Sequence, residues 1–213
     1  MSIPFSEIRG VIFDMDGTLT RPVIDFAEMR RRLDLPEGDI LATIRAWPPE
    51  RQRRAFAIIE ALEADARERM ALQPGARELL ETLERLGLER GLLTRNTLET
   101  VRRLQELIPV RFSAVVTRDF PTFKPDPAPA LHIASLWRLP PSAILLVGDY
   151  RDDLICGRQA GMFTVLLLEA RNRQWASLAD WTVPSLDELR RAFERSKTVL
   201  NGSKNGPPRS PRS

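Results

Sequence analysis

Short apolar runs alternate with helical patterns along most of this 213-residue sequence. Each run is apolar at nearly every position, which is typical of strands buried on both faces of a sheet. Between the runs, leucines recur at helical spacing after Pro74-Gly75 and again after Asn96, the expected N-cap of a second helix. Strand, helix and strand in repetition predict a parallel, doubly wound α/β sheet with helices on both faces. The predicted strands are residues 8–13, 91–94, 114–117, 143–147 and 163–168.

One segment, residues 20–73, departs from this alternation. Its patterns are helical throughout and are interrupted by Pro36 and by Pro48-Pro49. An ordinary crossover between parallel strands could grow long, but this segment far exceeds the usual length of such a connection. We therefore expect a small helical cap at residues 20–73, inserted after the first strand of a core formed by residues 1–19 and 74–195.

The net charge of +3 comes from the C-terminal tail. Residues 196–213 contain no acid and are rich in Gly, Pro, Ser and Asn, so we expect them to be disordered. Subtracting their four cations leaves the rest of the chain at −1, and the clusters Arg30–Arg32 and Arg51–Arg54 have acids nearby. A nucleic-acid partner is therefore not expected. The four cations of the tail are Lys197, Lys204, Arg209 and Arg212.

Nothing in the sequence indicates a membrane or a secretory route. No run approaches the roughly 18 to 20 apolar residues that span a bilayer, and the N-terminal MSIPFSEIRG lacks the pattern of a signal peptide. The lone Cys156 cannot form an internal disulfide, and we expect it to be a buried structural thiol. The sequence therefore predicts a cytoplasmic protein without a membrane partner, and it leaves the oligomeric state open.

The motif VIFDMDGT places Asp14 and Asp16 at the end of the first predicted strand. The carboxyl ends of strands are where open α/β sheets bind ligands. Two carboxylates one residue apart repel each other, so their pairing is useful only where a cation balances them. This motif therefore favours a charged site over a simple turn.

Three further segments would be brought to the same edge by a parallel sheet. LLTRNT places the hydroxyl of Thr94 beside a helix N-terminus, where an anion can bind. FKPDP carries Lys124, the only lysine in the first 195 residues of a chain that otherwise uses arginine. A compact ammonium suits a crowded site of carboxylates better than a planar guanidinium. The last segment, LVGDYRDD, brings Asp149, Asp152 and Asp153, of which Asp152 more simply favours the start of a helix.

In this order, and with a helical insert after the first, these four motifs resemble those of the haloacid dehalogenase superfamily. The resemblance covers roughly residues 8–195 and points to the phosphatase branch with a small helical cap, similar to phosphoglycolate phosphatases. It implies a Rossmann-like core. Haloacid dehalogenases typically lack the second aspartate, because a halide leaves without a proton, so Asp16 argues for phosphoryl transfer.

The resemblance also implies a mechanism. Asp14 is expected to attack a phosphoryl group and form an aspartyl-phosphate, and Asp16 to protonate the leaving group and later activate water. Thr94 and Lys124 are expected to assist catalysis by holding the phosphoryl group. Mg²⁺ is the expected cofactor, and a small phosphorylated metabolite is the expected substrate. The implied metal-site residues are Asp14, Asp16 through its backbone carbonyl, Asp149 and Asp153, and the implied substrate-binding residues are Thr94, Arg95, Asn96 and Lys124.

Three alternatives stay open at this point. A sugar phosphomutase of the β-phosphoglucomutase type would share all four motifs and differ in its cap. A catalytically quiet binding protein could use the same scaffold, although every chemical position is filled. Receiver domains also form an aspartyl-phosphate on a parallel sheet, but they lack the D-x-D-G-T pattern and a cap. The segment Thr20-Arg21-Pro22, where the family often has an acidic or small residue, leaves the substrate open.

Overall fold

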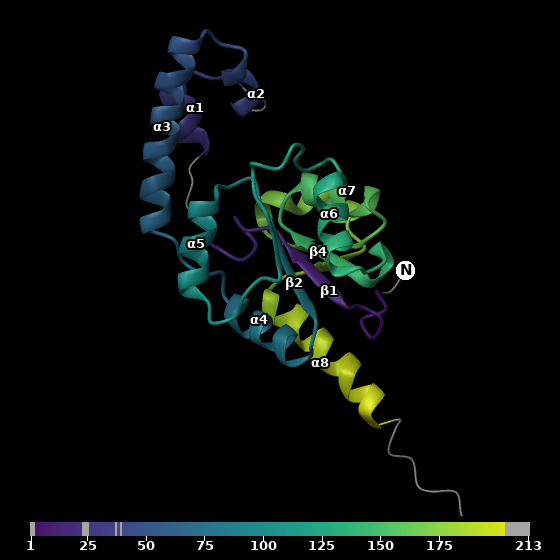
Figure 1. Cartoon of the computed structure of the whole chain (residues 1–213). Helices are drawn as coiled ribbons and strands as arrows, with labels where there is room; N and C mark the ends of the chain where they lie inside the picture. Colours follow the sequence, from purple (N-terminus) through teal and green to yellow (C-terminus); the bar gives the residue numbers. More distant parts are fainter. Residues whose placement is uncertain (1–2, 23–25, 37, 39, 203–213) are drawn as a thin grey trace, which may run out of the picture. The chain divides into compact units, whose positions relative to one another are not determined.

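The chain is described here from a computed structural model, which covers residues 3–22, 26–36, 38 and 40–202 (Figure 1). It divides into two compact units. The sheet unit consists of Met1–Thr20 and Leu72–Ser213, and the helical unit consists of Arg21–Ala71. These bounds lie within two residues of those expected for the insertion. That the helical unit acts as a cap stays a prediction.

A parallel sheet forms the centre of the sheet unit. Its strands are β1 (Gly10–Phe13), β2 (Glu89–Leu93), β3 (Ala114–Val116), β4 (Ile144–Gly148), β5 (Phe163–Leu167) and β6 (Trp181–Val183). In the described part of the chain these six strands have the order β3-β2-β1-β4-β5-β6, and all neighbours are parallel. This doubly wound order confirms the predicted α/β fold. β6 is not among the predicted strands, because its three residues include two that are only half-buried and form no apolar run.

β1 lies at the centre of the sheet, between β2 and β4, and is buried along its whole length. Phe13, its last residue, is level with Val147 of β4. When neighbouring parallel strands end level with each other, the residues that follow them lie close together at the same edge of the sheet. Backbone hydrogen bonds hold two of these residues in place: Asp14 N donates to Val147 O at 2.9 Å, and Thr94 N donates to Val116 O at 2.9 Å.

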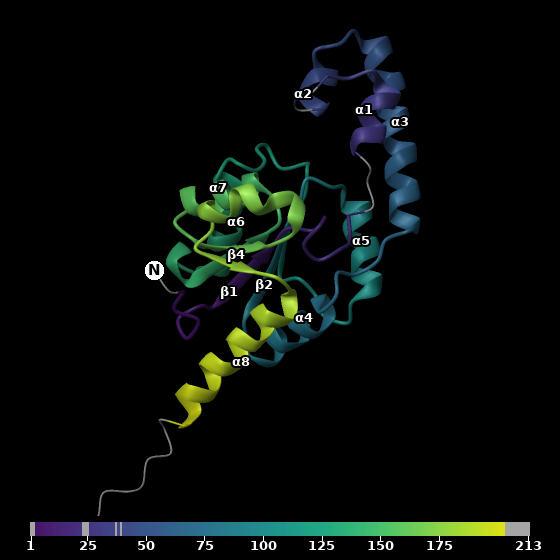
Figure 2. The ribbon, with the colours of Figure 1, turned by 180° about the vertical axis from the view of Figure 1, so that it is seen from behind.

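Helices cover both faces of the sheet (Figures 1 and 2). They are α4 (Ala76–Arg85), α5 (Leu98–Leu107), α6 (Ala128–Trp137), α7 (Arg151–Gln159) and α8 (Leu186–Gly202). Crossovers between parallel strands are right-handed, so the direction in which the chain moves along the sheet decides which face a helix covers. From β1 to β3 the chain moves toward one edge, which places α4 and α5 on one face. From β3 to β5 it moves toward the other edge, which places α6 and α7 on the opposite face. α8 packs against α4. The α6 and α7 side buries a core that includes Ile12, Ile133, Leu146 and Cys156.

The described residues of the helical unit form α1 (Phe26–Leu33), α2 (Ile40–Arg45) and α3 (Pro49–Glu68). α3 begins with Pro49 in its first turn, where the missing N–H of proline has no intrahelical partner to lose. The unit has a core of its own, which explains why it forms a compact body. That core consists of Met29, Leu33, Ile44, Ala55 and Ile59.

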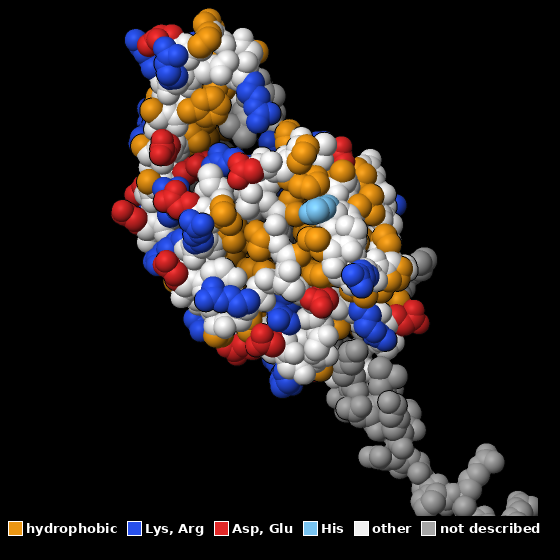
Figure 3. Space-filling view, viewed as in Figure 1, with side chains coloured by type: hydrophobic (Ala, Val, Ile, Leu, Met, Phe, Trp, Pro, Cys, Tyr) orange, Lys and Arg blue, Asp and Glu red, His pale blue; other side chains and the backbone are white. Residues whose placement is uncertain are grey.

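Several arginines of the helical unit are paired with acids one helical turn away. Arg31 and Arg32 both contact Glu28, and Arg53 contacts Glu50. On the face of the molecule in Figure 3, basic and acidic side chains are interspersed rather than gathered by sign. Within the described residues, no helix is both long enough and apolar enough to cross a bilayer.

The chain leaves the sheet unit and re-enters it through neighbouring segments. Thr20 and Leu72 form an antiparallel bridge. One residue further along, Arg21 N donates to Ala71 O at 2.9 Å. The first and last residues of the helical unit are therefore joined by backbone hydrogen bonding.

Two expectations at helix ends are wrong. α8 continues to Gly202, although residues from 196 onward are expected to be disordered, because extending an existing helix gains one hydrogen bond per residue without a new nucleus. The remainder of the expected tail, residues 203–213, lies outside the described residues. α5 is capped by Thr97 rather than Asn96, since the Thr97 hydroxyl accepts a hydrogen bond from Thr100 N at 3.2 Å.

Candidate active site

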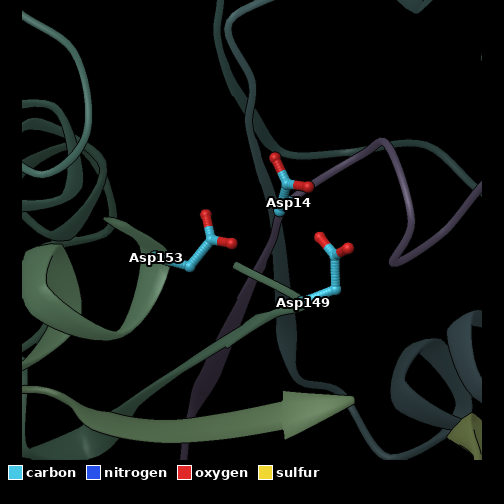
Figure 4. A group of neighbouring side chains, drawn as sticks. All are labelled: Asp14, Asp149 and Asp153. Atoms are coloured by element: carbon cyan, nitrogen blue, oxygen red, sulfur yellow. The ribbon is translucent and has the colours of Figure 1, made fainter. Parts of the chain in front are cut away.

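Three buried carboxylates meet at the carboxyl edge of the sheet (Figure 4). Asp14 follows β1, Asp149 follows β4, and Asp153 lies in the first turn of α7. Figure 4 shows the three side chains reaching into one space from these different elements. Each contributes an oxygen that lies within 4.8 Å of an oxygen from the other two. We call this group the carboxylate cluster.

Lys124 joins two members of the carboxylate cluster. Its Nζ lies 2.5 Å from Asp14 Oδ1 and 2.6 Å from Asp153 Oδ1, and the residue is only 4% exposed. The lysine comes from the segment between β3 and α6, 110 residues after Asp14 in the sequence. The fold therefore assembles this ion pair from distant parts of the chain, as the motifs predict.

The surroundings of the cluster shift its pKa values. Burial raises the pKa of Asp14 to about 7, and the charges of Asp153 and Asp149 add to the rise while Lys124 opposes it. Burial also raises the pKa of Asp149 to about 6, with a further contribution from Asp153. Burial disfavours the charged form of Lys124, but Asp14 and Asp153 outweigh it and raise the lysine pKa. Burial and the neighbouring carboxylates therefore disfavour the charged forms of Asp14 and Asp149.

The carboxylate cluster fits a divalent metal ion. It offers oxygen donors, which are the ligands that hard cations such as Mg²⁺ prefer. Its carboxylates repel one another, and that repulsion is relieved either by binding a proton or by binding a cation. Burial, with a smaller contribution from this repulsion, raises the pKa values of Asp14 and Asp149.

Two residues after β5 contact Asp149, and sequence reasoning missed both. Arg171 donates to Asp149 Oδ2 at 2.6 Å and to Glu169 Oε2 at 2.7 Å. Asn172, which is fully buried, donates to the backbone oxygens of Asp149 and Leu167, each at 2.9 Å. These residues lie at or near the start of a 3₁₀ segment, Ala170–Leu178, where the sequence has no motif that could have signalled them.

Two glycines make room for the carboxylates. A Cβ on Gly17 would lie 2.3 Å from Asp149 Oδ2, and Gly17 also has a φ of +82°. A Cβ on Gly148 would lie 2.4 Å from the carboxylate of Asp153. Asp153 Oδ2 in turn accepts a hydrogen bond from Tyr150 N at 3.0 Å, which ties it to the start of α7. Any larger residue at either glycine would displace a member of the cluster.

Asp16 lies apart from the carboxylate cluster that the described residues form. Its Oδ2 accepts a hydrogen bond from the side-chain amide of Asn96. Asn96 N in turn donates to the hydroxyl of Thr94 at 3.1 Å. The structure thus brings together two of the three predicted residues after β2 and the second aspartate of the first motif.

The remaining predicted residues lie around this group. The guanidinium carbon of Arg95 lies 4.7 Å from the ring centre of Phe123, the neighbour of Lys124. Asp152 contacts Arg151 at 3.4 Å and is not part of the carboxylate cluster. The substrate-binding roles expected of Thr94, Arg95 and Asn96 stay predictions.

Comparison with known proteins supports the resemblance. A sequence profile of the haloacid dehalogenase-like hydrolase family matches residues 8–161. A haloacid dehalogenase-like hydrolase domain-containing protein of Arabidopsis thaliana is 41% identical over 177 residues, which are 77% of this chain and 72% of the relative. A phosphoglycolate phosphatase of Pseudomonas syringae pathovar tomato is 30% identical over 210 residues, covering 85% of this chain and 77% of the relative.

Solved structures share the fold. A β-phosphoglucomutase from Clostridium difficile superposes with a TM-score of 0.72 at 17% identity, and the match covers 91% of this chain and 99% of the other. At that identity the similarity concerns the fold alone. The family profile spans the first strand and all four motifs, from the D-x-D-G-T segment to the aspartates after β4. The chain therefore belongs to the haloacid dehalogenase-like hydrolase family.

Proposed function

We propose that this chain is a Mg²⁺-dependent phosphatase that hydrolyses a small phosphorylated metabolite through an aspartyl-phosphate on Asp14. The observation that carries the proposal is the buried Lys124, which contacts both Asp14 and Asp153. Buried ion pairs contribute little net stability, so a purely structural role explains this lysine poorly. Membership of a hydrolase family and a relative named phosphoglycolate phosphatase support the same activity.

In the first step, a carboxylate oxygen of Asp14 forms a bond to phosphorus while the bond from phosphorus to the ester oxygen breaks. Asp16 gives its proton to the departing alkoxide. Lys124 holds Asp14 through Oδ1, which orients the carboxylate and offsets part of its charge as the anionic substrate approaches. The hydroxyl of Thr94, at the end of β2, would bind a phosphoryl oxygen.

In the second step, water attacks the phosphorus of the aspartyl-phosphate and the bond to Asp14 breaks. Asp16, now ionised, takes a proton from the attacking water. The step yields inorganic phosphate, the free carboxylate of Asp14 and a protonated Asp16. Protons and bonds therefore balance over one cycle, and the same residue serves as acid and as base.

The metal would be held by the carboxylates of Asp14 and Asp149 and by the backbone carbonyl of Asp16, with Asp153 beside them. When bound, Mg²⁺ would offset the negative charge of the phosphoryl oxygens. The grouping of three buried carboxylates, each with an oxygen within 4.8 Å of the others, supports this assignment. Lys124 and Tyr150 N would keep Asp153 oriented beside the metal ligands.

The proposed organisation is a catalytic core with a substrate-selecting cap. The helical unit would serve as that cap, since it is a compact insertion with its own core directly after the first motif. A cytoplasmic location completes the proposal, and the free, buried Cys156 agrees with a reducing compartment.

Phosphate release from a panel of small phosphomonoesters tests the proposal. With Mg²⁺, the wild-type chain should release phosphate, and kcat/KM across the panel should rank the substrates. Asp14→Asn and treatment with EDTA should each abolish turnover. Asp152→Asn is the matched control, because it removes a neighbouring carboxylate that lies outside the carboxylate cluster. A wild-type chain without turnover on any ester would overturn the proposal and favour a binding protein.

Product analysis in the same assay separates hydrolysis from the alternative of a sugar phosphomutase. The alternative is supported by the shared fold of a β-phosphoglucomutase. A mutase would convert a sugar phosphate into its isomer without net release of phosphate. A phosphatase would release phosphate in step with substrate loss.

A further inference from the structure

We infer that Asn96 is a positioning residue that holds the carboxylate of Asp16 in its working orientation. The inference rests on the proposed function, in which Asp16 is the general acid and base. The observation behind it is the hydrogen bond from the Asn96 side-chain amide to Asp16 Oδ2, between residues 80 apart in the sequence. Asn96 is 7% exposed, so this amide is shielded from water.

The backbone of Asn96 is fixed on both sides. Its N–H donates to the hydroxyl of Thr94 at 3.1 Å, and its carbonyl accepts from Arg118 N at 3.0 Å. The capping of α5 is carried out by Thr97, whose hydroxyl accepts from Thr100 N. The Asn96 side chain is therefore not needed for the cap and is presented to Asp16 from a rigid base formed by the ends of β2 and β3.

This contact decides how Asp16 can deliver a proton. An aspartate carboxylate rotates easily, because its terminal torsion has a broad energy profile. The hydrogen bond to Oδ2 restricts that rotation and occupies one oxygen with an N–H donor. Because a displacement of about 1 Å at a reacting group can lower a rate by about 100-fold, such a restraint has a measurable consequence.

Two other roles for Asn96 make different predictions. If its side chain contacts the substrate, as the sequence resemblance implies, its loss should raise KM for every ester, whether or not Asp16 is intact. If it only stabilises the loop, its loss should lower the melting temperature as the loss of the Thr97 cap does. A positioning role instead predicts a fall in kcat that depends on Asp16 and on the leaving group.

The first experiment compares Asn96→Ala with wild type on an alkyl phosphate and on p-nitrophenyl phosphate. The alkoxide needs a proton to leave, whereas nitrophenolate departs without one. We expect kcat for the alkyl ester to fall about 10- to 100-fold, with KM within about 2-fold. The first-turnover release of nitrophenolate should change little. Thr97→Ala, the matched control beside the same loop, should lower the melting temperature without this dependence on the leaving group.

The second experiment combines Asn96→Ala with Asp16→Asn in a double-mutant cycle on the alkyl ester. If Asn96 acts through Asp16, its removal should change the rate of the Asp16→Asn variant by less than about 2-fold. Losses that multiply would overturn the positioning role while leaving Asp16 as the acid, and so would wild-type activity of Asn96→Ala. Wild-type activity of Asp16→Asn would instead overturn the proposed function on which the inference rests.

Discussion

Pairs of opposite charge in the helical unit and around the carboxylate cluster of the sheet unit are of two different kinds. In the helical unit, pairs such as Asp65 and Arg69 lie one helical turn apart, and their side chains are 58% and 59% exposed. In the sheet unit, Lys124 pairs with Asp14 across 110 residues of sequence, and both are buried. The first kind of pair forms wherever a helix forms. The second exists only when the sheet is complete.

The energetic difference between the two kinds of pair indicates which one matters for function. An exposed pair at helical spacing contributes about 0.3–0.5 kcal/mol. A buried pair must overcome a desolvation penalty of several kcal/mol for each ion. A buried ion pair between residues distant in the sequence therefore indicates a functional role more strongly than an exposed pair on one helix does. The carboxylate cluster with Lys124 contains such a pair.

The largest effect should follow from removing the buried cation. Lys124→Met would leave Asp14 and Asp153 without their partner in a buried site. We expect the free energy of unfolding of the metal-free protein at pH 8 to fall by about 3–5 kcal/mol, the usual result of breaking a buried pair from one side. Urea denaturation followed by circular dichroism measures it.

Lys124→Arg is the matched variant, because it keeps the charge and changes only its shape. A planar guanidinium does not replace a compact ammonium in a crowded site, so we expect most phosphatase activity to be lost. Near-normal activity of Lys124→Arg would show that this position needs only a positive charge.

A smaller effect should appear in the pH dependence of stability. Folding raises the pKa of Asp14 from 3.8 to about 7, so the folded state binds more protons than the unfolded state in that window. Its contribution to stability is therefore full below pH 3.8 and is lost as the pH rises through about 7. With EDTA present, wild type should lose on the order of 2 kcal/mol more stability than Asp14→Asn between pH 5 and pH 8. Equal losses in the two proteins would contradict the shift.

The ion pair of Arg171 and Asp149 is intermediate between the buried and the exposed kinds of pair, because the carboxylate is buried while the arginine side chain is 47% exposed. Arg171→Met should remove a cation that competes with the metal for Asp149. Because solvent screens such a pair, we expect Mg²⁺ to bind only about 2- to 5-fold more tightly, measured by calorimetry. Weaker binding would instead show that Arg171 orients Asp149 for the metal.

The smallest effect should be found in the helical unit. Asp65→Asn breaks an exposed pair while keeping the shape of the side chain. We expect the free energy of unfolding to change by less than about 0.5 kcal/mol, with kcat/KM unaltered. A loss comparable to that of Lys124→Met would remove the distinction between the two kinds of pair.

The sequence predicted most of the fold because the central strands are buried on both faces. β1 and β4 are buried at every position, and such strands appear as uninterrupted apolar runs. β6 escaped prediction because Trp181 and Thr182 are half-buried at the sheet edge, so tertiary position and not local pattern makes it a strand. The N-cap of α5 is Thr97 and not the expected Asn96, because both residue types cap helices well and the local sequence does not distinguish them.

Of the site, only the residues that lie within the four sequence motifs could be predicted from the sequence. Asp14 and Asp149 come together because β1 and β4 are neighbours, and Asp153 joins them from the helix that follows β4, as expected. Arg171 and Asn172 contact Asp149 from a segment without a characteristic spacing, and only the folded chain reveals them. The link between Asn96 and Asp16 likewise joins residues 80 apart and has no local signal.

The bridge between Thr20 and Leu72 has a consequence for replacement of the helical unit. Because the two ends of the helical unit are already joined there by hydrogen bonds, a short turn could replace Arg21–Ala71 with little loop-closure entropy. The helical unit is thus attached to the sheet unit at one hydrogen-bonded pair of chain segments, and its replacement by a short turn should leave the sheet unit folded.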